Sequence, residues 1–287
     1  MQPRLVGRWK FDDGDAFTDS VADDVPGAPA HDGTGSVDGF VEGIDEGEAA
    51  YFTGTGVVTI SDSGEYYNFY PEGLTVTAWV KCELDRTWDG IVGKQSNEAG
   101  DWWVVGWSLG VNDSGISSAN FSVRNPWTDV FGNPDIGEIN DGEWHLVAGS
   151  FVPDYSERTC QMRVYVDGSL KDISEALDMS SVLTTSTHDV LIGKITQDYI
   201  SDGDFHGAID DVQIYNYALG EMDIAMMYLE QNEGMTVCVD QIEPWKAFDV
   251  AGEPGEPSFC KVDIEDFAEF ASAWMNCNLL KDCLQVD

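Results

Sequence analysis

The sequence predicts an all-β fold, a sandwich or a barrel of short strands, followed by a small helical tail linked by disulfides. Short runs of alternating apolar and polar residues recur along the chain, with Gly, Asp and Asn turn signals between them. No helical period of useful length appears before Gly220, which argues against a parallel α/β sheet. Four of the six cysteines lie after residue 237, where they suit a small stapled unit. We therefore expect a sandwich over residues 1–232 and a separate segment over residues 233–287.

Each expected strand is a short apolar run bounded by turn residues. The run Leu74–Val80 alternates cleanly, and successive side chains of a strand point to opposite faces. Asp167-Gly168, directly after an apolar run, is a hairpin signal. The expected strands are Leu5–Phe11, Ala49–Phe52, Val57–Ile60, Leu74–Cys82, Gly90–Lys94, Trp102–Val111, Ser118–Arg124, Trp144–Val152, Gln161–Asp167, Val190–Ile195 and Ala208–Tyr215.

Two helices are expected near the C-terminus. The first spans Glu221–Glu230 and should pack on the sandwich. Its expected packing face consists of Met222, Ala225, Met226 and Leu229. The second spans Asp263–Asn276 in the tail, with an apolar face of Phe267, Phe270, Ala271 and Trp274.

The charge balance excludes some partners. The chain has 53 acidic and 14 basic residues, a net charge of −39, which disfavours binding to nucleic acid or to anionic membranes. The hydrophobic fraction of 43% supports a sizeable core and argues against disorder. No apolar run approaches the roughly 20 residues of a membrane span. Some of the carboxylates are candidates for binding divalent cations, and the others would form a hydrated surface.

The cysteines indicate an oxidising environment. An even number with scattered spacing, without a Cys-x-x-Cys pair, favours disulfides over zinc and a secreted or cell-surface location. The opening residues Met1–Leu5 contain no apolar run, so no signal peptide is visible in this numbering. The six candidates for disulfides are Cys82, Cys160, Cys238, Cys260, Cys277 and Cys283.

One carboxylate in the last expected strand needs a partner. Strict alternation places Asp210 on the same face as Val212 and Ile214, which should meet the core, and it places Asp211 outside. An isolated buried charge is very costly, so Asp210 must be paired, protonated or bound to a metal ion.

A series of motifs follows the whole of the expected sandwich. In order they are RWKFDDG, a loop from TDS to HDGT, LTVTAWVK, GIVGK, WSLGV, INDGEWHLVAGSF, RVYVDG, VLIGK and FHGAIDDVQIYNYAL. Together they resemble the laminin G-like jelly-roll domains of secreted bacterial proteins, which belong to the wider concanavalin A-like lectin/glucanase fold. The resemblance covers roughly residues 4–230 and implies a two-sheet antiparallel jelly-roll sandwich. That fold hosts lectins, adhesion modules, glycosidases and spacers, so it implies an architecture more than an activity.

The resemblance implies a structural calcium ion between the N-terminal loop and the last strand. The family's last-strand aspartate falls on Asp210, its loop aspartate falls on Asp19, and Asp12 is the expected neighbour. Calcium takes six to eight oxygen ligands, so carboxylates from distant segments together with backbone carbonyls suffice. The alternative is that Asp210 accepts backbone N–H bonds or pairs with one of the cations Arg4, Arg8 or Lys10.

The tail motif CKVDIEDFAEFASAWMNCN resembles the dockerin-like, EF-hand-like segments of secreted planctomycete-type proteins. Gly255, Pro257 and Phe259 occupy three positions where a calcium loop needs oxygen ligands, so no well-formed calcium site is expected there. The resemblance implies the pairs Cys238–Cys260 and Cys277–Cys283, with Cys82–Cys160 in the sandwich, although six cysteines allow other pairings. The tail would bind a protein partner or another copy of the chain.

The sequence gives little sign of catalysis. Glucanases of this fold need two carboxylates about 5 Å apart, on alternate residues of one strand. The nearest pattern is Glu83-Leu-Asp85, which runs into polar residues, and no Gly-x-Ser-x-Gly elbow occurs. His206, beside Gly207, is interpreted as a turn histidine and not as a site residue. We therefore expect a protein that is not an enzyme.

Several tryptophans suit sugar binding, because a pyranose ring stacks on a flat aromatic face. Trp9, Trp79 and Trp144 lie in strand motifs and are expected in the core. The candidates for carbohydrate contact lie in loop-like segments: Trp88, Trp102, Trp103 and Trp127.

These observations together predict a secreted, non-catalytic, calcium-binding module for carbohydrate recognition or adhesion. Its expected partner is a glycan or a cell-surface polysaccharide. One alternative is a structural subunit of an extracellular fibre or surface layer. A second alternative is a glycoside hydrolase with unfamiliar catalytic spacing.

Overall fold

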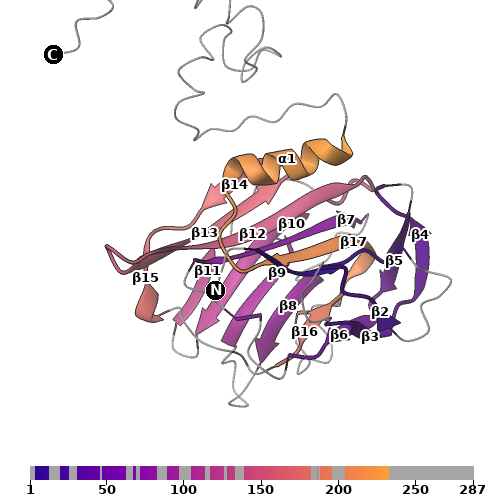
Figure 1. The fold of residues 1–287 in the computed structure, drawn as a ribbon, viewed down its shortest axis with the longest axis horizontal. Coiled ribbons are helices and arrows are strands. Elements are labelled where there is room, and N and C mark those ends of the chain that lie inside the picture. Colours follow the sequence, from indigo (N-terminus) through magenta and orange to yellow (C-terminus); the bar gives the residue numbers. More distant parts are fainter. Residues whose placement is uncertain are drawn as a thin grey trace, which may run out of the picture.

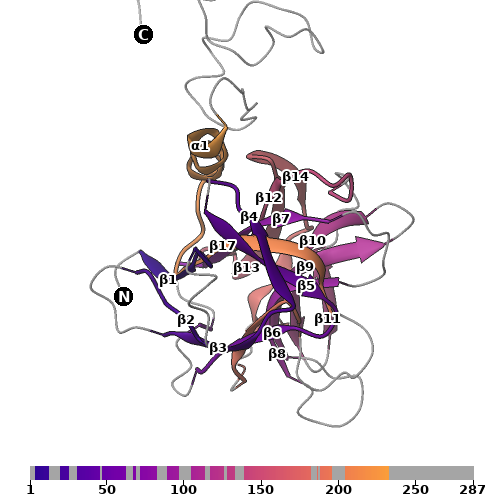
Figure 2. The ribbon, with the colours of Figure 1, turned by 90° about the vertical axis from the view of Figure 1, so that its right-hand side faces the viewer.

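The computed structural model describes fourteen stretches of the chain: residues 4–12, 20–25, 31–45, 47–62, 67–68, 72–82, 89–96, 105–113, 117–125, 128–132, 139–181, 186, 188–195 and 204–232. Within them the chain forms two antiparallel sheets that face each other and one α-helix outside them (Figures 1 and 2). The predicted all-β sandwich is therefore confirmed. The predicted tail, residues 233–287, lies outside the described residues.

The first sheet, sheet A, contains the last strand of the sandwich near one edge. Two further strands pair outside its main path: β1 (Leu5–Trp9) with β17, and β15 (Leu177–Asp178) with β13. The main order is β14 (Ser169–Ile173), β13 (Thr159–Val166), β12 (His145–Asp154), β7 (Leu74–Lys81), β17 (His206–Tyr215), β5 (Glu48–Thr53) and β4 (Gly39–Glu42).

The second sheet, sheet B, closes the core from the other side. Apolar side chains of both sheets, such as Val76 and Ile209 from sheet A and Trp107 and Leu109 from sheet B, form one buried cluster. The order of sheet B is β11 (Thr128–Gly132), β10 (Ser117–Asn125), β9 (Val105–Asp113), β8 (Asp89–Ser96), β16 (Val190–Ile192), β6 (Val57–Ile60), β3 (Gly33–Ser36) and β2 (Ser20–Val21).

Every predicted strand is present, with bounds that differ by at most three residues. Sequence reasoning missed the short strands β2, β3, β4, β11, β14 and β15. Strand β3, with the sequence GTGS, shows why: it has no apolar side chain to alternate, and only its pairing to β6 and β2 makes it a strand.

The predicted helix is confirmed as α1 (Glu221–Gln231), but half of its predicted packing face is wrong. Met222 and Met226 are 39% and 53% exposed, whereas Ile224 and Tyr228 are buried together with Ala225, as predicted. The ring of Tyr228 stacks on that of Trp79, on the outer face of sheet A, with centroids 5.8 Å apart. This large aromatic contact sets the rotation of the helix in place of the methionines.

A bulge in β17 overturns the predicted alternation. The pairing of β17 with β7 shifts register between Asp210 and Gln213, and Asp211 has a φ of 40°. Ile209 and Val212 therefore both reach the core, three residues apart. Asp210 pairs with Trp79 and so faces the outer side of sheet A, where it is nevertheless buried. Asp211, predicted outside, is only 7% exposed.

The predicted Cys82–Cys160 disulfide is wrong. Both cysteines are free and buried. Strand β12 lies between the strands of the two cysteines. Val80, two residues before Cys82, pairs with His145 at the start of β12, whereas Cys160 pairs with Pro153 near its end. Eight residues of extended chain span about 26 Å, far beyond the roughly 7 Å that a disulfide bridges. The remaining candidates Cys238, Cys260, Cys277 and Cys283 lie outside the described residues.

Two of the three tryptophans predicted in the core are buried. Trp9 is fully buried and its indole N–H donates to the carbonyl of His31 at 3.1 Å. Trp79 is 3% exposed, in a cluster on the outer face of sheet A. Trp144, predicted in the core as well, is only partly buried and packs against that outer cluster. The rings of Trp9 and Trp79 are therefore not available as a binding surface.

Candidate functional site

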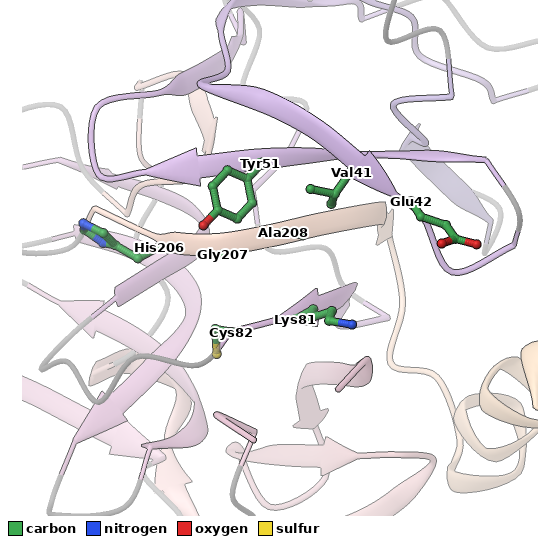
Figure 3. Close-up of a pocket in the computed structure, with 8 residues that line it drawn as sticks. All are labelled: Val41, Glu42, Tyr51, Lys81, Cys82, His206, Gly207 and Ala208. Carbon is green, nitrogen blue, oxygen red and sulfur yellow. The ribbon is translucent and has the colours of Figure 1, made fainter. Parts of the chain in front are cut away.

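A pocket of about 440 Å³ opens on the outer face of sheet A, near the edge formed by β4 (Figure 3). Its wall is drawn from β4, β5, β7 and β17, so a rigid four-stranded segment holds it. The lining residues are Val41, Glu42, Tyr51, Lys81, Cys82, His206, Gly207 and Ala208.

Strand pairing places three of these side chains in one row. Ala208 pairs with Lys81 of β7 on one side and with Tyr51 of β5 on the other. Directly paired residues point to the same face, so the row runs lysine, alanine, tyrosine across the sheet. Neighbouring strands lie about 4.8 Å apart, which separates the outer two Cα atoms by about 10 Å. The small methyl group of Ala208 leaves the depression between them.

Two of the few exposed large apolar side chains in the described part of the chain lie at this pocket. Tyr51 is 40% exposed and Val41 is 37% exposed. The others are Tyr155, Met222 and Met226. Exposed aromatic and aliphatic groups beside a pocket are typical of ligand contact.

His206 is fixed at the opposite end of the pocket from Glu42 (Figure 3). Its Nδ1 lies 3.0 Å from the carbonyl oxygen of Asp204. A carbonyl only accepts, so Nδ1 donates its hydrogen there, which sets the tautomer of the neutral ring. Gly54 packs against the ring, because a Cβ at Gly54 would collide with Cε1 and Nε2. The prediction that His206 is a turn residue is therefore wrong, since it begins β17 and lines the pocket.

Gly207 is required by the floor of the pocket. Its φ of 145° is a conformation that L-residues rarely adopt, and a Cβ there would collide with the carbonyl oxygen of Lys81. The glycine thus lets β17 approach the end of β7 closely.

Cys82 contributes bulk and not reactivity. Its thiol donates to the carbonyl of Ile139 at 3.0 Å. Burial raises the pKa of the Cys82 thiol to about 12, helped by the negative charges of Asp89 and Asp141. The thiolate needed for nucleophilic chemistry is therefore not formed at neutral pH.

A second cluster of polar groups surrounds the loop Gly43–Gly47, which joins β4 to β5. Asp210 lies beneath it and accepts two backbone N–H bonds, from Ile44 at 3.0 Å and from Asp211 at 2.7 Å. Burial raises the pKa of Asp210 to about 7 against the effect of these two bonds. The predicted alternative, in which backbone N–H groups are the partners of Asp210, is the arrangement found.

Asp12 approaches the same loop, and Asp45 is part of it. A Cβ at Gly47 would collide with Oδ1 of Asp12 and lie 3.1 Å from Oδ1 of Asp45. Lys10 Nζ is 3.8 Å from Oδ2 of each carboxylate. Burial raises the pKa of Asp12, and the charge of Asp45 raises it further.

The donor types at this loop suit calcium, which binds carboxylate and carbonyl oxygens. In the stretches that the structure describes, however, no three acidic, histidine or cysteine side chains are close enough to hold a metal ion. Asp12 and Asp210 lie at the same loop, and Asp45 is a neighbour that sequence reasoning missed. Asp19 lies outside the described residues.

Arg8 pairs with Asp211 and not with Asp210. Its Nε donates to Oδ1 at 2.6 Å and its Nη2 to Oδ2 at 3.0 Å. Gln213 also donates to Asp211, at 2.7 Å, and the hydroxyl of Tyr215 donates to Gln213 at 2.6 Å. This chain of hydrogen bonds satisfies the polar groups on the outer face of β17.

The four predicted sugar-contacting tryptophans, Trp88, Trp102, Trp103 and Trp127, lie outside the described residues. Sequence reasoning did not find Val41, Glu42, Tyr51 or Lys81. No local signal could have found them, because pairing between strands far apart in sequence brings them together.

Comparison with known proteins places these features in a family. A laminin G-like family model, described as the concanavalin A-like lectin/glucanases superfamily, matches residues 52–225. Domain 4 of AbnA, a GH43 extracellular arabinanase from Geobacillus stearothermophilus solved with arabinotriose, is similar in structure. It has a TM-score of 0.56 and 18% identity, over 79% of this chain and 100% of that domain.

Two toxin structures share the fold. The binding domain of Paraclostridial Mosquitocidal Protein 1 has a TM-score of 0.54 and 14% identity, over 79% of this chain and 52% of the other. A botulinum neurotoxin type C structure, described as showing that cell entry depends on two ganglioside molecules, gives 0.54 and 14%, over 82% and 53%. The chain thus spans about half the length of these two toxin structures.

No curated protein matches the sequence. In the described residues, no helix combines the length and the apolar character needed to cross a membrane.

Proposed function

Because the chain belongs to the concanavalin A-like lectin/glucanases superfamily, we propose that it is a non-catalytic module for carbohydrate recognition or adhesion that acts outside the cell. The observation that carries this proposal is the pocket around the exposed ring of Tyr51. Its expected ligand is a glycan or a cell-surface polysaccharide.

The pocket combines what a sugar site needs. The face of Tyr51 offers a stacking surface for the C–H groups of a sugar ring, and Val41 extends the apolar area. Glu42, Lys81 and His206 supply a carboxylate, an ammonium and an imidazole to sugar hydroxyls. All of them stand on paired strands, so binding would order little of the protein.

The same pocket argues against hydrolysis. Of the eight residues that line it, only Glu42 carries a carboxylate. Both retaining and inverting glycosidases use two carboxyl groups that flank the scissile bond. The similar structures also favour binding: the arabinanase domain was solved with arabinotriose, and the two toxin structures are a binding domain and a ganglioside-dependent neurotoxin.

The test is a glycan array followed by calorimetry on the best ligand. Tyr51→Ala should weaken binding by about 10-fold or more, since an aromatic contact contributes about 0.5–1.5 kcal/mol in addition to the apolar area that it buries. Tyr155→Ala is the matched control, because Tyr155 is 59% exposed and lies at the β12–β13 turn, away from the pocket. Equal binding by both variants, or an array without a hit, would remove the proposal.

We further propose that calcium stabilises the loop Gly43–Gly47, held by Asp12, Asp19 and Asp210 with Asp45 as an added ligand. The raised pKa values of Asp12 and Asp210 support this, because an adjacent cation relieves both desolvation and like-charge repulsion. The ion would add positive charge to carboxylates whose partners among the described residues are Lys10 and backbone N–H groups.

Thermal unfolding with calcium and with a chelator tests the metal. Chelation should lower the melting temperature of the wild type, and Asp12→Ala and Asp210→Ala should abolish the calcium-dependent difference. Asp154→Ala is the control, since Asp154 bonds only within its own turn in the described residues. Identical melting curves with and without calcium would leave the loop without a metal.

Self-association is a second candidate function. Met222 and Met226 lie one turn apart on the exposed face of α1, and residues 233–287 continue directly from that helix. We propose that this end of the molecule is where neighbouring copies or a protein partner would dock. Sedimentation of the full chain, alone and with Met226→Lys, tests it: monomers at high concentration would exclude assembly between copies.

A further inference from the structure

Lys81, which has no ion-pair partner among the described residues, points to the class of sugar that the pocket takes. We propose that the pocket around Tyr51 binds an anionic saccharide, with Lys81 as the residue that contacts the carboxylate or sulfate group. This inference rests on the proposed carbohydrate-binding function and narrows it.

Several lysines in the described part of the chain lie close to carboxylates, whereas Lys81 does not. The chain has 14 basic residues and 53 acidic ones, so a basic side chain is expected to have a carboxylate nearby. Lys94 lies 2.7 Å from Asp62, and Lys194 lies 2.9 Å from Asp204. Lys81 is half-buried, yet within the described part of the chain it has no ion-pair partner. A basic residue that stays unpaired amid such an excess of acid suits an anion supplied by a ligand.

The position of Lys81 matches a sugar stacked on Tyr51. The two residues flank Ala208 in one row, with Cα atoms about 10 Å apart. Lys81 lies on the other side of β17 from Tyr51, and its ammonium group points away from the tyrosine (Figure 3). The lysine side chain is long and flexible, so rotation about its bonds would bring the ammonium group within reach of a substituent on the far edge of a ring that lies on Tyr51.

The surroundings strengthen a charge contact there. Apolar groups of Val41, Gly207 and Ala208 form much of the wall, and charges attract more strongly where water is partly excluded. Glu42 lies at the edge of the pocket, away from Tyr51 and His206 (Figure 3). Its position leaves Lys81 as the charge beside the Ala208 depression, and its carboxylate can accept a sugar hydroxyl.

The net charge of −39 works against any anionic ligand at long range. That repulsion depends on the total charge, whereas the Lys81 contact is local. A control variant that removes an equal charge elsewhere distinguishes the long-range repulsion from the local contact of Lys81. Lys171 meets this need: it lies on β14, at the opposite edge of sheet A from β4, and has no ion-pair partner among the described residues.

The experiment measures binding to pairs of saccharides that differ only in charge. Each pair joins a neutral oligosaccharide to its uronic acid or sulfated counterpart, and the proteins are wild type, Lys81→Met, Lys81→Arg and Lys171→Met. The wild type should bind at least one anionic member about 10- to 100-fold more tightly than its neutral partner, the range for a charge-assisted hydrogen bond. Lys81→Met should lose this preference, so that the anionic and the neutral member of each pair bind with similar affinity. Lys81→Arg and Lys171→Met should retain it.

The outcomes separate this inference from the proposed function. Binding of neutral sugars that depends on Tyr51, with no preference for the anionic partners, would overturn the role of Lys81 and leave carbohydrate recognition intact. A preference that survives Lys81→Met would also overturn it. If no saccharide binds the folded wild type, both the proposed carbohydrate recognition and the proposed role of Lys81 are wrong. The carboxylate and sulfate arms show which anionic group the pocket accepts.

Discussion

Replacement of His145 should change the pH dependence of stability in a defined direction. His145 Nδ1 lies 2.9 Å from Oδ2 of Asp167, and its Nε2 lies 3.0 Å from Oδ1 of Asp141. Burial alone would lower the pKa of His145, but the hydrogen bonds to the two carboxylates outweigh it and raise the pKa to about 9. The imidazolium thus joins the loop before β12 to the turn after β13.

The contribution of His145 to the free energy of unfolding follows from its pKa shift. A rise from 6.5 to about 9 corresponds to roughly 3 kcal/mol of stability at most. Asp141 is 52% exposed, so solvent screens part of the interaction and we expect about 1–2 kcal/mol. Because the folded pKa is the higher one, this stability is fully present below pH 6.5 and is lost as the pH rises through 9.

Urea unfolding of wild type and His145→Gln at pH 6 and pH 10 measures the effect. The difference between the two proteins should be about 1–2 kcal/mol larger at pH 6, and the subtraction cancels the repulsion that the acidic surface contributes to both. Proton NMR titration of the histidines gives an independent readout, since the resonance missing in His145→Gln should titrate near pH 9. An equal difference at both pH values, or a titration near 6.5, would refute the reasoning.

Three further predictions test the packing. Lys94 and Asp62 form a buried ion pair at 2.7 Å, so Lys94→Met alone should cost about 3–5 kcal/mol in urea unfolding, and the double variant with Asp62→Leu should recover part of it. Gly207→Ala should lower stability by about 2 kcal/mol or more and disturb the pocket, whereas Gly39→Ala, which meets open space, should have little effect. Tyr228→Ala should destabilise the fold by about 2–4 kcal/mol, whereas Met226→Ala should change it by less than about 0.5 kcal/mol.

Local pattern was enough to predict most of the fold. Strands such as Val57–Ile60 have alternating apolar side chains and turn residues at both ends, and these features act within a few residues. The helix Glu221–Gln231 was found for the same reason. Its rotation was not, because Trp79 lies more than a hundred residues away in the chain and decides which side Tyr228 occupies.

The site was beyond local pattern. No local sequence pattern marks Tyr51, Lys81 or Ala208 as a site residue. Only the register of β17 with β5 and β7 brings the three together. The disulfide prediction failed for a similar reason, since an even number of cysteines says nothing about the strand that separates Cys82 from Cys160. Register is set by long-range pairing and packing, which a single sequence does not display.

The bulge in β17 places Asp210 against the β4–β5 hairpin, and the strands of the same hairpin form part of the pocket wall. One extra residue at Asp211 carries both Ile209 and Val212 into the core, so Asp210 must point to the outer face. Burial of that carboxylate then depends on the loop Gly43–Gly47, which donates the Ile44 N–H to it. The same β4–β5 hairpin carries the pocket residues on its strands, with Ala208 beside Tyr51 just before the bulge. The groups that hold the loop Gly43–Gly47 over Asp210 therefore also fix one wall of the pocket. This applies to the backbone N–H groups and equally to a bound cation.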